Sequence, residues 1–246
     1  MTAAYTEVLS FLKTSHDEFQ VLAEEIKFNG SDTLHRSCVS LYGSILELTT
    51  SFVILTDKGL LTGASVLVRS ILEAYVDLEN LTRDKSYLRD MEVSFAAEWL
   101  KILNEAAHGK NPYLGKLSEV PDLAEAIQKW EKKKAELESQ GGRALRHLEK
   151  FQKANLENEY RSVYNDLCSK AHNNLRALFD RHSEMGEDDF SITYYKIPEE
   201  ADNALTVGIV TEILMRATLT LHSYFDSSVL NRVKTRRQEL DKLRGD

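Results

Sequence analysis

Arg69 and Glu73 stand four positions apart within 63–81, a stretch that is apolar on nearly every side from 64 to 76. In a helix, this spacing places both side chains on one face, where they can form an ion pair. A charge in an apolar interior is stable only when it is paired and hydrogen-bonded. We therefore expect this pair either to join a buried polar network or to face a cleft. Glu212 and Arg216, also four apart in an apolar stretch, repeat the arrangement.

A histidine further along the chain could complete such a group. His172 follows Cys168 by four residues and Tyr164 by eight, so the three side chains share one helix face. If this helix packs against the first, Glu73 can orient the imidazole and Arg69 can hold Glu73. A carboxylate, an imidazole and a guanidinium together can perform general acid–base catalysis or bind a phosphate. The alternative is an ion network that only fixes the register of two helices.

The same region also suits a pocket for a small ligand inside a helical bundle. Tyr75 and Tyr164 would line this pocket together with His172, and the neighbouring Asn173 adds an amide. Aromatic surfaces with a few polar groups are typical of ligand pockets. The candidate catalytic residues are thus Arg69, Glu73 and His172, and the candidate ligand-binding residues are Tyr75, Tyr164 and Asn173.

Hydrophobic residues recur at three- and four-residue steps through most of the chain, which is the helical period. The predicted helices are 3–28, 33–56, 63–81, 84–107, 157–181 and 199–230, followed by a basic tail with helical propensity over 231–246. Two stretches, 64–76 and 205–221, are apolar on nearly every side, and such helices belong in the centre of a bundle. The segment 191–197 favours β structure, and we expect a loop there with at most a short extended piece.

These elements predict one all-α domain over 1–246, a multi-helix bundle with two nearly all-apolar central helices. Residues 121–140 are rich in lysine and glutamate and lead to two glycines. We interpret 116–154 as a charged helical arm that projects from the bundle. Because apolar helices can also pair between two copies of a chain, a homodimer is one hypothesis for the assembly.

The composition is that of an ordinary globular protein, with 246 residues, 42% of them hydrophobic and 28% charged. A net charge of −8 argues against a protein that wraps nucleic acid without sequence preference. Cys38 and Cys168 lie in apolar helical contexts, as reduced core thiols of cytosolic proteins do. The sequence shows neither a signal-peptide pattern nor a run of about 18 uncharged apolar residues. We expect a cytoplasmic protein that does not enter the membrane.

The common catalytic and metal-binding motifs are missing or incomplete. The sequence has no glycine-rich phosphate loop and no serine-hydrolase elbow. Glu105-Ala-Ala-His108 matches half of a di-iron signature, but di-iron bundles need this motif twice and there is no second copy. We therefore predict no metal and no cofactor.

Two short motifs resemble a bacterial family defined by a domain of unknown function. Arg69-Ser-Ile-Leu-Glu73 matches the R-S-x-x-E signature of that family, and Tyr164-x-x-Leu-Cys-x-x-x-His172 matches its second motif. The resemblance covers 32–81 and 160–179. It implies an all-helical fold and a role in bacterial defence, such as phage defence, or in stress, without an established reaction. It also makes Arg69, Glu73 and His172 the motif residues of this chain.

A more remote similarity is to HEPN-type helical bundles, which include metal-independent ribonucleases. Their motif is an arginine followed four to six residues later by a histidine, and two pairs approach it, Arg176 with His182 and Arg216 with His222. Six positions on an ideal helix rotate two side chains about 240° apart, so each pair needs a kink or a helix end to converge. The alternative for each pair is an exposed arginine and an ordinary histidine.

The sequence alone leaves three functions open. The first is an interaction module in defence or stress, with a protein partner and no catalysis. The second is a HEPN-like ribonuclease or toxin acting on RNA, in which His172 or His182 is the acid–base group and an arginine binds the scissile phosphate. The third is a bundle that binds a small ligand. Whether the protein is an enzyme is not decided by these residues.

Overall fold

The computed structural model describes residues 5–185, 190–195 and 200–245, and most of these residues are helical, with two short strands. The prediction of an all-α, multi-helix bundle is therefore confirmed. The chain forms two compact units: Met1–Thr82 together with Phe151–Asp246, and Arg83–Lys150 between them in sequence.

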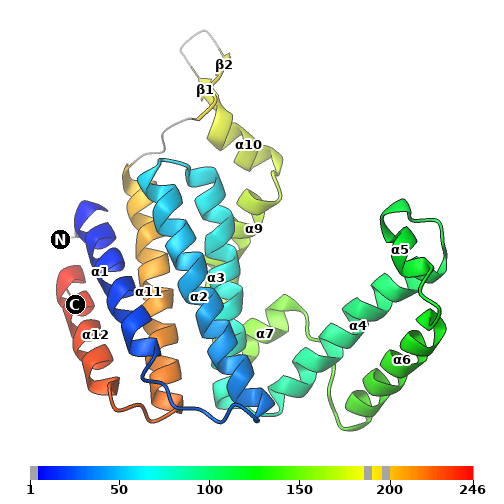
Figure 1. Cartoon of the computed structure of the whole chain (residues 1–246). Helices are drawn as coiled ribbons and strands as arrows, with labels where there is room; N and C mark the ends of the chain where they lie inside the picture. Colours follow the sequence, from blue (N-terminus) through cyan, green and yellow to red (C-terminus); the bar gives the residue numbers. More distant parts are fainter. Residues whose placement is uncertain (1–4, 186–189, 196–199, 246) are drawn as a thin grey trace. The chain divides into compact units, whose positions relative to one another are not determined.

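Figure 1 shows the helices of the first unit, and short polar signals set the ends of some of them. Asp32 caps α2 by accepting hydrogen bonds from the backbone amides of Leu34 and His35. Gly59 follows α2 with a φ of 69°, a conformation that favours glycine. The elements are α1 (Tyr5–Ala23), α2 (Thr33–Asp57), α3 (Leu61–Arg83), α8 (Glu157–Glu159), η2 (Tyr160–Tyr164), α9 (Asn165–Ala171), α10 (Leu175–His182), β1 (Ser183–Met185), β2 (Phe190–Ile192), α11 (Glu200–Tyr224) and α12 (Leu230–Arg244), while α7 (His147–Lys153) crosses the boundary between the units.

The core of the first unit forms around α11, which contacts α1, α2 and α12 (Figure 1). Its apolar side chains, such as Val210 and Leu214, are buried, as is Ile71 on α3. The buried hydroxyls of Tyr42 on α2 and Thr218 on α11 lie 3.0 Å apart, so the two helices are also joined by a hydrogen bond. Burial of apolar surface is the main favourable contribution to such a fold.

The prediction of one continuous helix over 157–181 is wrong, because the chain departs from α-helix twice within it. Tyr160–Tyr164 forms a π-helical turn, a feature that is frequent at functional sites. After α9, Asn173 adopts a left-handed conformation with a φ of 50°, which asparagine tolerates better than most residues. Asn174 then caps α10 with its side-chain oxygen. His172 consequently lies at the end of a helix and not within one.

The predicted last helix over 199–230 is also shorter than expected. α11 ends at Tyr224, and Asp226 adopts a left-handed φ of 46° in the turn that follows. The tail then forms α12, which contacts α1 and α11 instead of extending the previous helix. Val233 and Leu240 on α12 are fully buried, and only this reversal gives them an apolar surface to cover.

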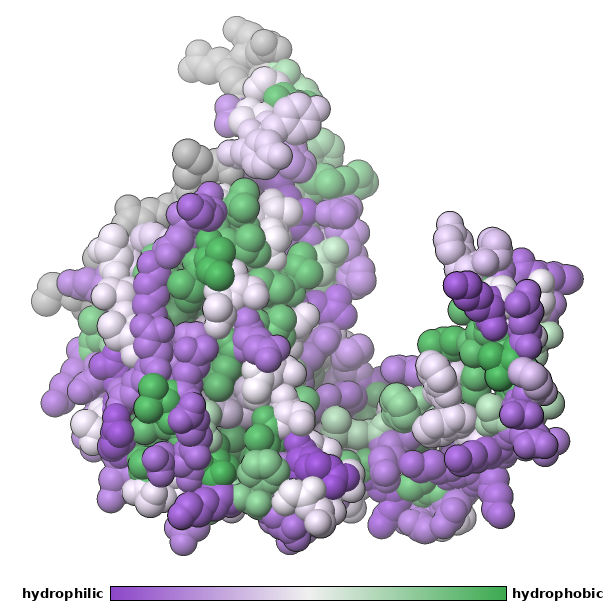
Figure 2. Space-filling view, in the orientation of Figure 1, coloured by the Kyte–Doolittle hydropathy of each residue, from purple (hydrophilic) through white to green (hydrophobic). Residues whose placement is uncertain are grey.

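The second unit consists of α4 (Tyr87–Ala107), η1 (Pro112–Leu114), α5 (Gly115–Ser118) and α6 (Leu123–Ser139). α6 packs against α4, and a core cluster contains Leu103, Ala106 and Leu123 with the partly buried Trp99 and Trp130. Figure 2 shows hydrophobic residues gathered around α5 and hydrophilic residues over most of the rest of this unit's visible face. The lysine- and glutamate-rich helix of the predicted arm, α6, thus has one apolar side and one solvated side.

Two helices, α2 and Asn203–Tyr224 of α11, are long and apolar enough to span a membrane by length and composition, a test that core helices of soluble proteins also pass. The exposed face of α2 carries Arg36, Ser40, Ser44 and Glu47, and toward its C-terminal end the apolar Ile54, which is 56% exposed.

Candidate functional site

Arg69, Glu73, Tyr164 and His172 meet in the first unit, and we call them the polar cluster. On α3, the Nε of Arg69 donates a hydrogen bond to Oε1 of Glu73 at 3.0 Å. The hydroxyl of Tyr164, at the end of η2, donates to the same carboxylate oxygen at 2.7 Å and accepts from Nη2 of Arg69 at 3.4 Å. Nη1 of Arg69 lies 2.9 Å from Nε2 of His172, which follows α9. The structure thus brings the three candidate catalytic residues together with Tyr164.

The contact with Arg69 defines the state of the imidazole ring. A guanidinium group can only donate hydrogen bonds, so Nε2 of His172 must accept. The ring that makes this contact is therefore neutral and carries its proton on Nδ1. The sequence led us to expect that Glu73 would orient the ring. In the structure Arg69 contacts the ring, while Glu73 holds Arg69 and Tyr164.

The polar cluster is partly buried and electrically balanced. The side chains of Arg69 and Glu73 are 20% and 32% exposed, Tyr164 is buried, and His172 is exposed. Burial raises the pKa of Tyr164 and the hydrogen bond to Glu73 raises it further, so the phenol stays protonated and donates. The cluster can brace α3 against the segment 160–172, or it can exchange protons at its exposed ring. Which of these it does stays a prediction.

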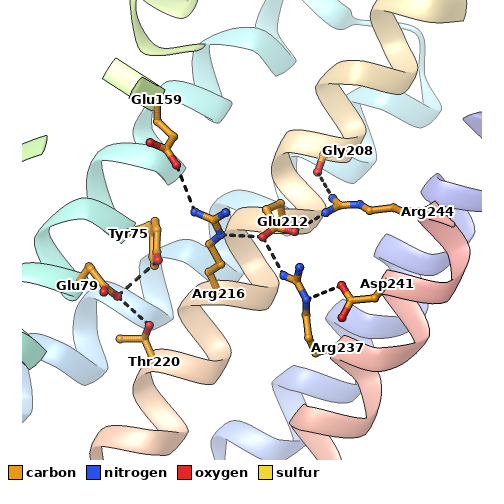
Figure 3. A network of polar contacts seen from close by, with 10 residues as sticks. All are labelled: Tyr75, Glu79, Glu159, Gly208, Glu212, Arg216, Thr220, Arg237, Asp241 and Arg244. Atoms are coloured by element: carbon orange, nitrogen blue, oxygen red, sulfur yellow. Dashed lines mark hydrogen bonds and ion pairs between the residues drawn. The ribbon is translucent and has the colours of Figure 1, made fainter. Parts of the chain in front are cut away.

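The other two candidate ligand-binding residues lie in different surroundings. The hydroxyl of Tyr75 donates to Glu79 at 3.4 Å, and Thr220 on α11 donates to the same carboxylate at 2.9 Å (Figure 3). Asn173 accepts a hydrogen bond from Arg181 at 2.7 Å. These contacts are with neighbours outside the polar cluster.

The members of each arginine–histidine pair have different neighbours. Arg176 pairs with a carboxylate in the next turn of α10, whereas the ring of His182 lies near a backbone carbonyl just after β2. Arg216 contacts two carboxylates, whereas His222 is fully buried and, within the described part of the chain, neither of its ring nitrogens has a hydrogen-bond partner. Burial lowers the pKa of His222 and favours its neutral form. The similarity to HEPN-type bundles stays a prediction.

The half motif Glu105–His108 lies at the end of α4. Nδ1 of His108 lies 2.6 Å from the carbonyl of Asn104, and Glu105 accepts a hydrogen bond from Asn111 at 3.4 Å. Among residues 5–185, 190–195 and 200–245, no group of three or more histidine, cysteine, aspartate or glutamate side chains is placed to hold a metal ion.

A second polar network surrounds Glu212, and the sequence predicts only part of it. Glu212 and Arg216 on α11 form the pair that their spacing suggests, at 2.7 Å. Arg237 and Arg244 on α12 donate to the same carboxylate at 2.8 and 2.5 Å (Figure 3). Burial raises the pKa of Glu212, but the hydrogen bonds from the three arginines outweigh it and lower the pKa to about 2. The signal that could have revealed the network is the spacing of Arg237, Asp241 and Arg244, which places them on one helix face.

A pocket of about 650 Å³ adjoins this network within the first unit. Most of its lining is apolar, and its charged groups come from α8, α11 and α12. The lining residues are Val8, Leu72, Glu159, Val163, Ala204, Leu205, Gly208, Ile209, Glu212, Ile213, Arg216 and Arg244. Leu72 directly precedes Glu73, and Val163 directly precedes Tyr164, so the pocket and the polar cluster share α3 and η2.

No curated protein and no solved structure matches the chain. A family described as a family of unknown function, DUF5677, matches residues 35–191, which is more than half of the chain. This range contains the polar cluster and both motifs of the family resemblance, whereas α11 and α12 lie outside it. The predicted relationship to a domain-of-unknown-function family is thereby confirmed. The chain belongs to DUF5677, a family of unknown function.

Proposed function

We propose that the protein binds a small, largely apolar molecule in the pocket beside Glu212. The observation that carries this proposal is the pocket itself, about 650 Å³ in volume and lined mainly by aliphatic side chains with a few charged groups. Ligand sites in proteins have this size, and a few polar groups orient an otherwise apolar ligand. Of the three functions that the sequence leaves open, ligand binding is the one that this geometry supports best. The place differs from the one expected from the sequence, because the residues that line this pocket do not include Tyr75, Tyr164, His172 or Asn173.

The polar cluster supports the proposal as a brace for one wall of the pocket. Leu72 and Val163 line the pocket, and each directly precedes a residue of the cluster. The hydrogen bond from Tyr164 to Glu73 ties η2 to α3 and so holds these two aliphatic side chains in place. A wall that is held before the ligand arrives loses less conformational entropy on binding.

The other hypotheses lead to different experiments. In the HEPN-like hypothesis an arginine binds the scissile phosphate. The guanidinium of Arg69 already binds Glu73, so the cluster would have to rearrange to take that role. A role in defence or stress with a protein partner stays a prediction, as does a homodimer. A cytoplasmic location without membrane insertion also stays a prediction.

Nile red, an uncharged dye whose fluorescence rises in apolar surroundings, tests the proposal. The wild-type protein should bind the dye with a saturable rise in fluorescence, and the dye should raise the melting temperature. Ala204→Trp places an indole in the pocket. It should weaken dye binding by about tenfold or more, because the indole occupies the volume that the dye needs.

Ser51→Trp is the matched control, because it adds the same indole to the exposed face of α2. This variant should bind Nile red as the wild type does. The proposal is overturned if Ala204→Trp and the wild type bind the dye equally while circular dichroism shows both to be folded. The dye would then lie elsewhere.

A further inference from the structure

Arg216 is the cation best placed to meet a ligand in the pocket. Its Nε donates to Glu212 at 2.7 Å, which holds one side of the guanidinium on α11. Its Nη1 lies 3.3 Å from an oxygen of Glu159, and all three residues line the pocket. Burial lowers the pKa of Arg216, but the hydrogen bond and charge of Glu212 outweigh this and raise it. Arg216 is therefore a permanent positive charge on the pocket wall.

Glu159 occupies the position that an incoming anion would take. It ends α8, a helix of three residues that leads directly into η2. Its carboxylate is 35% exposed, and its contact with Arg216 is longer than the 2.7 Å contact of Glu212. Partly exposed ion pairs of this kind contribute little to stability. A ligand carboxylate can thus displace Glu159 at small cost, whereas Glu212 is held by three arginines.

The charges of the network favour an anionic ligand over a cationic one. Three arginines donate to the single carboxylate of Glu212, and Asp241 pairs with Arg237 at 2.8 Å (Figure 3). Once Glu159 is displaced, the guanidinium groups of the three arginines face only the carboxylates of Glu212 and Asp241. The network then carries one net positive charge. A ligand carboxylate restores the balance. An ammonium group could pair only with Glu159, and it would then lie beside the guanidinium of Arg216, whose like charge disfavours it.

We propose that the ligand is an amphipathic carboxylate. Its carboxylate binds Arg216 in place of Glu159, and its alkyl body lies against aliphatic side chains that include Leu72, Val163 and Ile209. Transfer of the alkyl body from water to this lining is favourable in proportion to the apolar area that it buries. This inference rests on the proposed function, because it names the class of molecule that the pocket takes.

Three probes with the same ten-carbon chain test the inference: decanoate, decanol and decyltrimethylammonium. Each is titrated into the full-length protein at pH 7, below its micelle-forming concentration, by isothermal titration calorimetry. Decanoate should bind about tenfold or more tightly than decanol, which is the factor expected for a hydrogen bond to a charged group, and the cation should bind most weakly. Arg216→Gln should lower the affinity for decanoate to that for decanol, without changing decanol binding.

Two further variants complete the experiment. Glu159→Gln should tighten decanoate binding several-fold, because the competing carboxylate is gone. Arg232→Gln is the matched control, since it removes an exposed arginine that pairs with Glu18 at 3.0 Å and does not line the pocket. This variant should bind decanoate as the wild type does.

Equal affinities for decanoate and decanol, or tighter binding of the cation, would overturn the carboxylate assignment while leaving a ligand pocket in place. If, in addition, Nile red does not bind the wild-type protein in the pocket, the proposed function itself is overturned. If Arg216→Gln does not fold, Glu159→Gln decides the matter alone. Unchanged or weaker binding of decanoate to that variant contradicts the displacement of Glu159.

Discussion

Replacing Glu212 by glutamine removes the carboxylate on which three guanidinium groups converge, and it should destabilise the first unit strongly. The hydrogen bonds of the arginines hold the pKa of Glu212 at about 2, against an ordinary value of 4.5. A difference of this size corresponds to about 3 kcal/mol of unfolding free energy at pH 7. Because the side chain is only 18% exposed, solvent screens little of this interaction.

The pH dependence separates this mechanism from a loss of packing. A carboxyl group whose pKa is lowered on folding stabilises the protein above its unfolded-state pKa. It loses this contribution as the pH falls toward the folded-state pKa. The gap in stability between the wild type and Glu212→Gln should therefore be full at pH 7 and narrow below pH 4.5. Between pH 7 and pH 4 it should shrink by about 1 kcal/mol.

Urea unfolding followed by circular dichroism at pH 7, pH 5 and pH 4 measures this gap. Glu239→Gln is the matched control, because Glu239 pairs with Arg236 at 2.6 Å on α12 and is 48% exposed. An exposed pair of this kind contributes about 0.5 kcal/mol or less. The reasoning is refuted if Glu212→Gln lowers the unfolding free energy by less than about 1 kcal/mol at pH 7, or if it lowers it equally at pH 7 and pH 4.

Three further predictions concern the first unit. Tyr164→Phe removes the hydroxyl that donates to the carboxylate of the polar cluster and should lower the unfolding free energy by about 1–2 kcal/mol in urea titrations; unchanged stability would contradict the brace. Burial, with a smaller contribution from the charge of Asp32, raises the pKa of Cys38 to about 11. Ellman's reagent at pH 8 should therefore modify the partly exposed Cys168 in the native protein and Cys38 only after unfolding. Equal rates of modification of the two thiols in the native protein would contradict this. His172→Ala removes an exposed ring and should lower the unfolding free energy by less than about 1 kcal/mol. If the wild type degrades RNA in the presence of EDTA and this variant does not, the ribonuclease hypothesis is supported over a purely structural cluster.

The helical period predicts the main helices well, because hydrophobic spacing and end signals agree in them. α2 begins directly after the capping residue Asp32 and ends two residues before Gly59. The prediction fails at Asn173 and Asp226, where a left-handed residue ends a helix. Asparagine and aspartate also occur inside helices, so their identity alone does not mark a break.

The polar cluster could be anticipated because its members obey helical spacing. The step from Arg69 to Glu73 keeps both side chains on one face, and the steps that join Tyr164 to His172 do the same. Tyr75 lies two positions after Glu73, which turns its side chain about 200° around α3. Its hydroxyl therefore belongs to a different network, with Glu79 and not with the cluster.

What the sequence determines by itself is local: the positions of the helices, the apolar character of α3 and α11, and the ion pairs within one helix. Only the tertiary structure decides that α12 turns back, so that Arg237 and Arg244 reach Glu212, and that parts of α1, α3, α8, η2, α11 and α12 enclose a pocket. The physical reason is that side-chain spacing is a property of a single helix. Which faces meet depends instead on how several apolar surfaces cover one another at the same time.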